Sequence, residues 1–280
     1  MSIDLSTMAT FGVAGNFTGH LEQAGEATDF TNVKTVEAKA PKAVFPTFIP
    51  NAGAKVPDYL KVFPFDSRNI IFPTGEQNLQ IEPECAIVCE LTWNDNRVTS
   101  LKPVSFAASN DCSIRKAGAR KISEKKNWGR SSKGFSDTVI PIDSFSTEGA
   151  INNFRIASFL IRDGVSYAYG EDSAVRDYSY IYDKLLVWLV DKLNNQADEG
   201  PAENIGVYLR DAGCPNMAMI SIGATRYTEF GEHNYLKNGD LSVVVVYPEK
   251  RYSKTQIEEQ VAKLNFAIDG ASVLCQKVIV

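Results

Sequence analysis

Residues 79–93, LQIEPECAIVCELTW, have the composition of a buried strand, yet two carboxylates, Glu82 and Glu84, stand inside it. Side chains alternate along a strand, so Glu82 and Glu84 project from the same face with their Cα atoms about 7 Å apart. Two carboxylates at that separation repel by about 2 kcal/mol at an effective dielectric constant of about 20. A solvated edge face would relieve this repulsion; in a core, a metal ion or Arg and Lys side chains must do so.

Strands outnumber helices in the rest of the chain. Residues 154–171 indicate a hairpin, because the alternating FRIASFLI is followed by an Asp-Gly turn and by VSYAYG. Apolar residues at helical spacing predict helices at 180–195 and 253–264, the second with Ser253 as N-cap, and one or two helical turns at 20–27. Further strands are expected at 11–17, 104–113, 138–145, 218–224, 241–248 and 272–280. The sequence therefore predicts a mostly β (α+β) fold.

Seven prolines lie between residues 41 and 83, where they exclude central strands and long helices. We interpret this stretch as ordered loops and short edge strands. It suggests a small N-terminal subdomain at 1–75 and a main domain at 76–280. The basic stretch 114–134, which also contains Gly and Ser, predicts an irregular loop or lid.

Composition excludes several classes of protein. The chain has 280 residues, 44% hydrophobic and 22% charged, with a net charge of −5, so a soluble globular protein is expected and nucleic acid is not an expected partner. Its longest apolar runs are too short to span a bilayer, and the N-terminus lacks the pattern of a signal peptide. Five scattered cysteines then predict reduced thiols and a cytoplasmic location.

Several short motifs follow one another along the chain. In order, they are Asn16-Phe17-Thr18-Gly19-His20, Glu82-Pro83-Glu84, Asn110-Asp111 with Arg115, Trp128 with Lys133-Gly134-Phe135, Gly223-Ala224-Thr225, and Leu236-Lys237-Asn238-Gly239-Asp240. This ordered series, over residues 11–248, resembles the fumarylacetoacetate hydrolase family. The resemblance implies a rolled mixed β-sheet or β-sandwich with few helices and an active site at its mouth.

The resemblance also implies a metal site. Glu82, Glu84 and Asp111 would bind one Mg²⁺, Mn²⁺ or Ca²⁺, which would explain the carboxylates in the strand at 79–93. Three carboxylates with no Cys or His among them suit a hard divalent ion. The alternative is a surface pair with Arg partners.

Other site residues follow from the same resemblance. Lys133 would stabilise an enolate, and His20 would act as a general base or acid. Arg115 would anchor a substrate carboxylate, with Gly223 and Thr225 holding the substrate. A solvated lysine, a structural histidine and a structural ion pair are the corresponding alternatives.

The chain departs from the family around the substrate pocket. The glutamate expected three residues after the histidine is Gln23, flanked by Glu22 and Glu26, so we assign Glu22 as the catalytic partner while leaving the other two open. Gly-Ala-Thr-Arg replaces the family's Gly-Thr-Pro turn, and the C-terminus adds a helix and a strand.

The expected function is therefore a metal-dependent hydrolase that cleaves a carbon–carbon bond in a 2-oxo acid or 1,3-dicarbonyl acid. A decarboxylase, hydratase or isomerase of the same family and a non-catalytic binding protein on the same scaffold remain alternatives. Family members are commonly dimers, and exposed edge strands would favour pairing, so a homodimer is expected.

Overall fold

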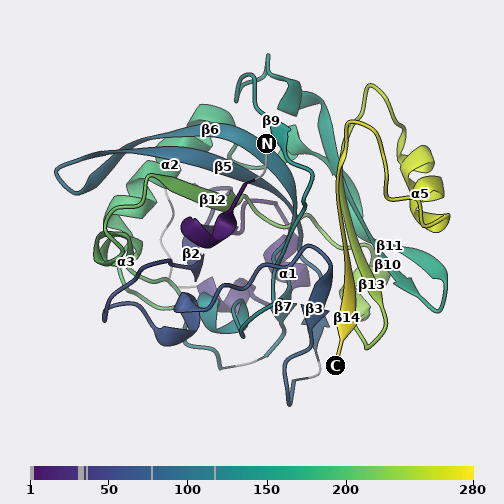
Figure 1. Cartoon of the computed structure of the whole chain (residues 1–280), viewed down its shortest axis with the longest axis horizontal. Coiled ribbons are helices and arrows are strands. Elements are labelled where there is room, and N and C mark those ends of the chain that lie inside the picture. Colours follow the sequence, from purple (N-terminus) through teal and green to yellow (C-terminus); the bar gives the residue numbers. More distant parts are fainter. Residues whose placement is uncertain (1–2, 31–34, 36, 77, 117) are drawn as a thin grey trace.

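The computed structural model describes residues 3–30, 35, 37–76, 78–116 and 118–280. Two curled sheets and a few short helices make up the fold (Figure 1). This arrangement confirms the expected mostly β class with few helices. No helix in the described ranges is long and apolar enough to cross a bilayer.

The larger sheet is mixed and has seven strands. Its order is β2-β1-β12-β5-β6-β8, and β9 pairs with β6; only the β1–β12 pair is parallel among its ladders. The strands are β1 (Ala9–Ala14), β2 (Ala43–Phe48), β5 (Pro83–Asn94), β6 (Arg97–Asn110), β8 (Gly134–Phe135), β9 (Ile140–Pro141) and β12 (Met217–Ser221).

The second sheet has five strands in the order β11-β10-β13-β14-β3, and a separate ladder joins β4 to β7. These strands are β3 (Asn69–Ile71), β4 (Leu79–Gln80), β7 (Ser113–Ile114), β10 (Phe154–Arg162), β11 (Val165–Ala174), β13 (Leu241–Pro248) and β14 (Ser272–Ile279). The predicted hairpin at 154–171 is thus the β10–β11 pair.

The helices are α1 (His20–Gln23), α2 (Tyr182–Asn195), α3 (Ile205–Asp211), α4 (Glu229–His233) and α5 (Lys254–Ala262). Both predicted helices form, and Ser253 caps α5 by accepting a hydrogen bond from the backbone N–H of Gln256. Helix α2 packs against β6 and β2, and α5 packs at the far side of the five-stranded sheet (Figure 1). The predicted strand at 138–145 is reduced to the two residues of β9.

The main core lies between the two sheets. Alternate residues of β10 and β13, such as Ile156 and Val244, point into it. The intervening residues, such as Phe159 and Val245, face the opposite way and pack on Ile257 of α5. The C-terminal helix therefore covers a sheet face that would otherwise be exposed.

The first 75 residues supply strands to both sheets. β1 and β2 pair within the seven-stranded sheet, and β3 pairs with β14. Both β2 and β3 are edge strands, as the proline content of 41–83 predicted. The division into domains at residue 75 stays a prediction.

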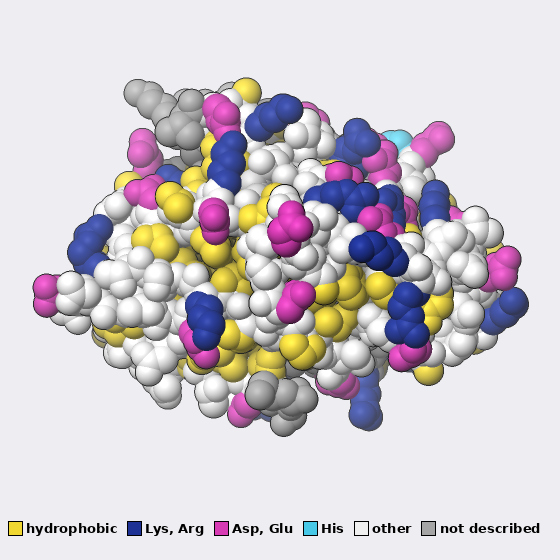
Figure 2. All heavy atoms as spheres, turned by 90° about the horizontal axis from the view of Figure 1, so that it is seen from above, with side chains coloured by type: hydrophobic (Ala, Val, Ile, Leu, Met, Phe, Trp, Pro, Cys, Tyr) yellow, Lys and Arg dark blue, Asp and Glu magenta, His cyan; other side chains and the backbone are white. Residues whose placement is uncertain are grey.

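The surface carries charges of both signs. On the face drawn in Figure 2, Lys and Arg side chains alternate with Asp and Glu side chains, with apolar side chains between them.

Candidate active site in a buried charge cluster

The β5–β6 hairpin brings the predicted acidic residues together. Its two-residue loop, 95–96, has positive φ at both positions (49° and 59°), the conformation of a type I′ turn that fits twisted strands. The register shifts twice along the hairpin, and at its other end Pro83 pairs with Asn110. Just beyond this pair, the backbone N–H of Asp111 donates to the carbonyl of Glu82 at 3.0 Å.

Glu82, Glu84 and Asp111 form a compact acidic triad. One carboxylate oxygen from each lies within 4.8 Å of the others, and all three residues are buried. Asn110 supports the geometry, because its side-chain oxygen accepts a hydrogen bond from the backbone N–H of Glu82 at 3.1 Å. The alternative of a solvated edge pair is therefore excluded for Glu82 and Glu84.

Two lysine side chains neutralise part of the triad. Lys126 Nζ lies 2.6 Å from Glu82 Oε2 and 2.8 Å from Asp111 Oδ2. Lys133 Nζ lies 3.0 Å from the other oxygen of Asp111 and also donates to the carbonyl of Cys112. Both lysines are buried, so they are not the solvated residues of a basic loop.

Arg115 is held by protein groups on several sides. Its guanidinium donates to Gln80 Oε1 at 2.6 Å, to Glu26 Oε1 at 2.6 Å and to the Tyr227 hydroxyl at 2.8 Å. It also lies 2.7 Å from Glu82 Oε1. Most of its five N–H donors are thus engaged, which favours a positioning role over direct binding of a substrate carboxylate.

The electrostatic environment differs between the two glutamates. Burial and the carboxylates of Asp111 and Glu82 raise the pKa of Glu84 well above its usual value. Burial also opposes ionisation of Glu82, but Lys126 and Arg115 outweigh it and lower the pKa of that carboxyl. Burial likewise disfavours the charged form of Lys126, but Asp111 and Glu82 outweigh it and raise the pKa of the ammonium group. Glu82 and Lys126 therefore form a tight ion pair.

His20 lies in the same region, at the start of α1. Its Nδ1 is 2.9 Å from the carbonyl oxygen of Thr225, and its ring is buried. Because a carbonyl only accepts, Nδ1 carries the proton, and in the neutral ring Nε2 is the basic nitrogen. Burial lowers the pKa of His20, which favours this neutral form.

The 223–225 turn offers one unused polar group. The backbone N–H of Gly223 donates to Glu84 Oε2 at 2.7 Å, so it holds the triad and is not free for substrate. The side-chain hydroxyl of Thr225 is buried and has no hydrogen-bond partner among the described residues. Of the residues expected to hold substrate, Thr225 therefore retains the clearest capacity to bind it.

The three acidic or amide candidates after His20 take different places. Glu22 lies two residues after His20 in α1, and side chains two apart in a helix point to nearly opposite sides. Because His20 is buried, Glu22 is exposed and lies outside the buried cluster. Gln23 exchanges hydrogen bonds with the backbone of Tyr227. Glu26 is buried and pairs with Arg115 and with Lys125 at 2.9 Å. None of the three hydrogen-bonds to His20 within the described part of the chain.

Sequence reasoning missed Lys126, Lys125 and the role of Glu26. The two lysines belong to the stretch 114–134, where a run of basic residues suggested a solvated loop. They are buried because a 3₁₀ turn, Ile122–Lys125, is anchored by Ser123. The Ser123 hydroxyl donates to the carboxylate of Glu203 and is 2.7 Å from the hydroxyl of Tyr59.

The triad fits a divalent metal by donor type. Three carboxylates provide hard oxygen ligands. Moreover, Glu82 Oε1 and Asp111 Oδ2 are buried and accept no hydrogen bond of good geometry among the described residues. The nearest cationic groups are those of Arg115, 2.7 Å from Glu82 Oε1, and Lys126, 2.8 Å from Asp111 Oδ2. Lys126, however, contacts two of the three carboxylates that such an ion would use.

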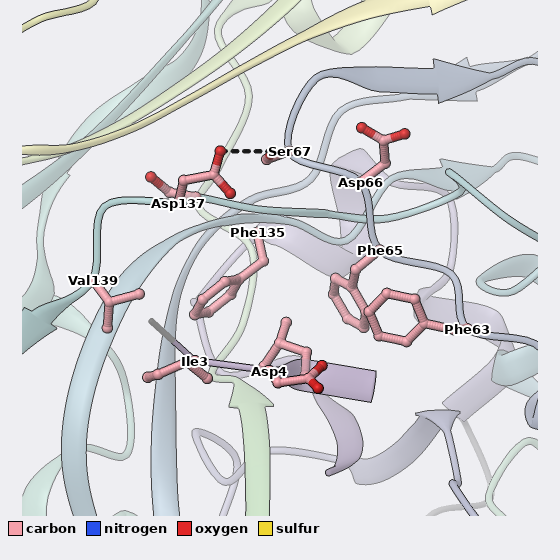
Figure 3. A pocket seen from close by; sticks show the side chains of 11 residues that line it. Ile3, Asp4, Phe63, Phe65, Asp66, Ser67, Phe135, Asp137 and Val139 are labelled. Carbon is pink, nitrogen blue, oxygen red and sulfur yellow. Dashed lines mark hydrogen bonds between the residues drawn. The ribbon is translucent and has the colours of Figure 1, made fainter. Parts of the chain in front are cut away.

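A separate cavity of about 370 Å³ lies between the N-terminal segment and residues 63–67 and 135–139. Figure 3 shows the rings of Phe63, Phe65 and Phe135 around it, with the hydroxyl of Ser67 donating to Asp137 at 2.9 Å. None of the predicted site residues, all of which the structure describes, lines this cavity.

Comparison with known proteins identifies a family and a fold. A family model described as "Family of unknown function (DUF5718)" matches residues 26–278. No curated protein matches the chain.

Several solved structures share the fold at low sequence identity. A "2-keto-3-deoxy-D-arabinonate dehydratase complexed with magnesium and 2,5-dioxopentanoate" is 12% identical with a TM-score of 0.54, covering 98% of this chain and 73% of that one. A 5-carboxymethyl-2-hydroxymuconate delta-isomerase from Mycobacterium smegmatis is 14% identical with a TM-score of 0.52, covering 100% and 81%. A fumarylacetoacetate hydrolase family protein from Yersinia pestis CO92 is 13% identical with a TM-score of 0.52, covering 99% and 95%. The predicted resemblance to the fumarylacetoacetate hydrolase family is thus confirmed for the fold.

Proposed function

We propose a function for this chain on the premise that it belongs to the DUF5718 family, which is described as a family of unknown function. The chain is a divalent-metal-dependent enzyme that acts on a 2-oxo acid or a 1,3-dicarbonyl acid. The observation that carries this proposal is the buried triad of Glu82, Glu84 and Asp111, whose carboxylate oxygens lie within 4.8 Å of one another.

The chemistry of the neighbouring residues supports an enolate reaction. A divalent ion held by the triad, with Mg²⁺ as the first candidate and Mn²⁺ or Ca²⁺ as alternatives, would polarise a substrate carbonyl. Lys133 brings a positive charge to the same place, where it would stabilise negative charge that develops on a carbonyl oxygen. His20 Nε2 supplies a basic nitrogen for moving a proton.

Hydrolysis of a carbon–carbon bond is the first candidate reaction. His20 would then take a proton from the attacking water, while Lys133 holds the leaving enolate. Decarboxylation, hydration or dehydration, and isomerisation need the same stabilised enolate with a different proton transfer. Solved structures with this fold are described as a dehydratase and an isomerase, which supports these as the nearest alternatives.

The unpartnered hydroxyl of Thr225 supports a polar substrate beside the triad. Arg115, engaged by Gln80, Glu26 and Tyr227, would hold the carboxylate of Glu82 in position. A homodimer in the cytoplasm is the proposed assembly. The exposed side chains of Ile71 on β3 and Ile279 on β14 supply a candidate apolar surface for pairing.

A non-catalytic binding protein is the second candidate. The contacts of Lys126 with Glu82 and Asp111 favour it, because they neutralise part of the triad without any metal. This candidate predicts no turnover of any oxo acid, with or without a divalent ion.

A substrate screen separates the two candidates. Wild-type protein would be incubated with a panel of 2-oxo acids and acylpyruvates in Mg²⁺, in Mn²⁺ and in EDTA, with products followed by mass spectrometry. We expect metal-dependent turnover of at least one compound, loss of it in His20→Gln and Lys133→Met, and full activity in His233→Gln, a matched change at the exposed second histidine. Turnover that persists in EDTA, or in His20→Gln, would contradict the proposed mechanism.

A further inference from the structure

The ammonium group of Lys126 lies where a divalent metal ion would contact Glu82 and Asp111. Its ammonium group lies 2.6 Å from Glu82 Oε2 and 2.8 Å from Asp111 Oδ2, and its side chain is 2% exposed. A divalent ion bound by Glu82, Glu84 and Asp111 would use the same two carboxylates. Two cations held by the same two carboxylates repel each other strongly in a buried site.

The backbone holds Lys126 at this position. Its N–H donates to the carbonyl of Ser123 at 3.0 Å, which closes the 3₁₀ turn before it. The Ser123 side chain is itself fixed between Tyr59 and Glu203. The lysine therefore enters the triad from a well-anchored turn and not from a long free loop.

The buried cluster holds as many acidic as basic side chains when Lys126 is included, although the raised pKa of Glu84 opposes its ionisation. Four acidic and four basic side chains, each more than nine-tenths buried, make up the cluster: Glu26, Glu82, Glu84, Asp111, Arg115, Lys125, Lys126 and Lys133. A divalent ion added to this set would leave an uncompensated positive charge away from water, which is unfavourable. Withdrawal of Lys126 from the triad would remove one positive charge and vacate the contested oxygens.

We propose that Lys126 is a tethered cation that exchanges with the divalent metal at the triad. In the metal-free protein its ammonium group holds the carboxylates of Glu82 and Asp111 together; when the metal binds, the side chain leaves. In its position between Glu82 and Asp111, the ammonium group also lies 5.1 Å from the centre of the Phe45 ring, a cation–π contact. This inference rests on the proposed metal site, and it predicts that the wild-type chain binds metal weakly.

Binding of Mn²⁺ alone tests the exchange. Wild type, Lys126→Met and Lys125→Met would be freed of metal with EDTA, dialysed and titrated with MnCl₂, with free Mn²⁺ followed by electron paramagnetic resonance. Lys125→Met is the matched control, because it removes a buried positive charge from the adjacent position, where Lys125 pairs with Glu26. Circular dichroism would verify that each variant is folded. If Lys126→Met is unfolded, Lys126→Gln replaces it, because glutamine retains hydrogen-bond donors for the carboxylates of Glu82 and Asp111.

We expect Lys126→Met to bind Mn²⁺ at least about tenfold more tightly than wild type, which corresponds to about 1.4 kcal/mol. Lys125→Met should retain the wild-type affinity, and adding Asp111→Asn to Lys126→Met should abolish the gain. Equal affinities of wild type and Lys126→Met would overturn the exchange while leaving the metal site intact. Absence of Mn²⁺ binding in all folded variants would instead overturn the metal in the proposed function, and the exchange with it.

Discussion

Replacing Asp111 by Asn tests how strongly the buried cluster depends on its charge pairing. Asp111 pairs with Lys133 at 3.0 Å and with Lys126 at 2.8 Å, and both lysine side chains are at most 2% exposed. Asparagine keeps the shape but removes the charge that both lysines face. Breaking a buried pair by removing one partner costs about 3–5 kcal/mol, because the remaining charge stays away from water.

The expected loss lies near the lower end of that range. Lys126 would keep its contact with Glu82 at 2.6 Å, and Lys133 would keep the carbonyl of Cys112 and the ring of Trp128. We therefore expect Asp111→Asn to lower the free energy of unfolding by about 3 kcal/mol in EDTA.

Urea unfolding followed by tryptophan fluorescence measures this change. Glu90→Gln is the control on the same hairpin, because its pair with Lys102 is 3.2 Å long but exposed, and such pairs contribute about 0–1 kcal/mol. A loss below about 1 kcal/mol in Asp111→Asn, similar to that of the control, would refute the argument that these charges are buried and interdependent.

Three further changes test the fold, two of them near the site and one at α5. Burial raises the pKa of Glu203 to about 8, so the folded protein binds more protons than the unfolded chain from about pH 4.5 to pH 8. Stability should therefore fall as pH rises through this window, and Glu203→Gln should flatten the melting temperature against pH; an unchanged profile would contradict this assignment. Gly223→Ala should destabilise the fold by about 1–3 kcal/mol, because the backbone of Gly223 has φ of +123° and the new Cβ atom would lie 3.0 Å from Cβ of Asn16. A thermal melt identical to that of the wild type would contradict this strain. Ser253→Ala should cost about 1 kcal/mol through loss of the α5 cap, measured by urea unfolding, with no effect on Mn²⁺ binding.

Alternation along the strand predicted that Glu82 and Glu84 share one face, but only the family resemblance added Asp111 to them. The β5–β6 ladder, whose register shifts twice, brings Asp111 beside the two glutamates. What the alternation could not show is that both faces of β5 are buried: Cys85 and Ile87 pack in the main core, whereas Ala86 and Val88 pack in a separate cluster. A strand covered on both faces leaves its carboxylates no solvent.

The countercharges could not be predicted in the same way. Lys126 has the same local signature as a solvated lysine, and its burial depends on hydrogen bonds between Ser123, Tyr59 and Glu203. These residues are far apart in the sequence. Similarly, the sequence could not show which of Glu22, Gln23 and Glu26 joins the buried cluster: α1 ends at Gln23, and only Glu26, three residues beyond it, pairs with Arg115.

A divalent cation held by Glu82, Glu84 and Asp111 would be visible in crystals soaked in MnCl₂ and measured at a wavelength with strong manganese anomalous scattering. We expect one anomalous peak within coordination distance of all three carboxylates, with the Lys126 ammonium group moved away from Glu82 and Asp111. A map without that peak, with Lys126 still lying between the two carboxylates, would contradict it.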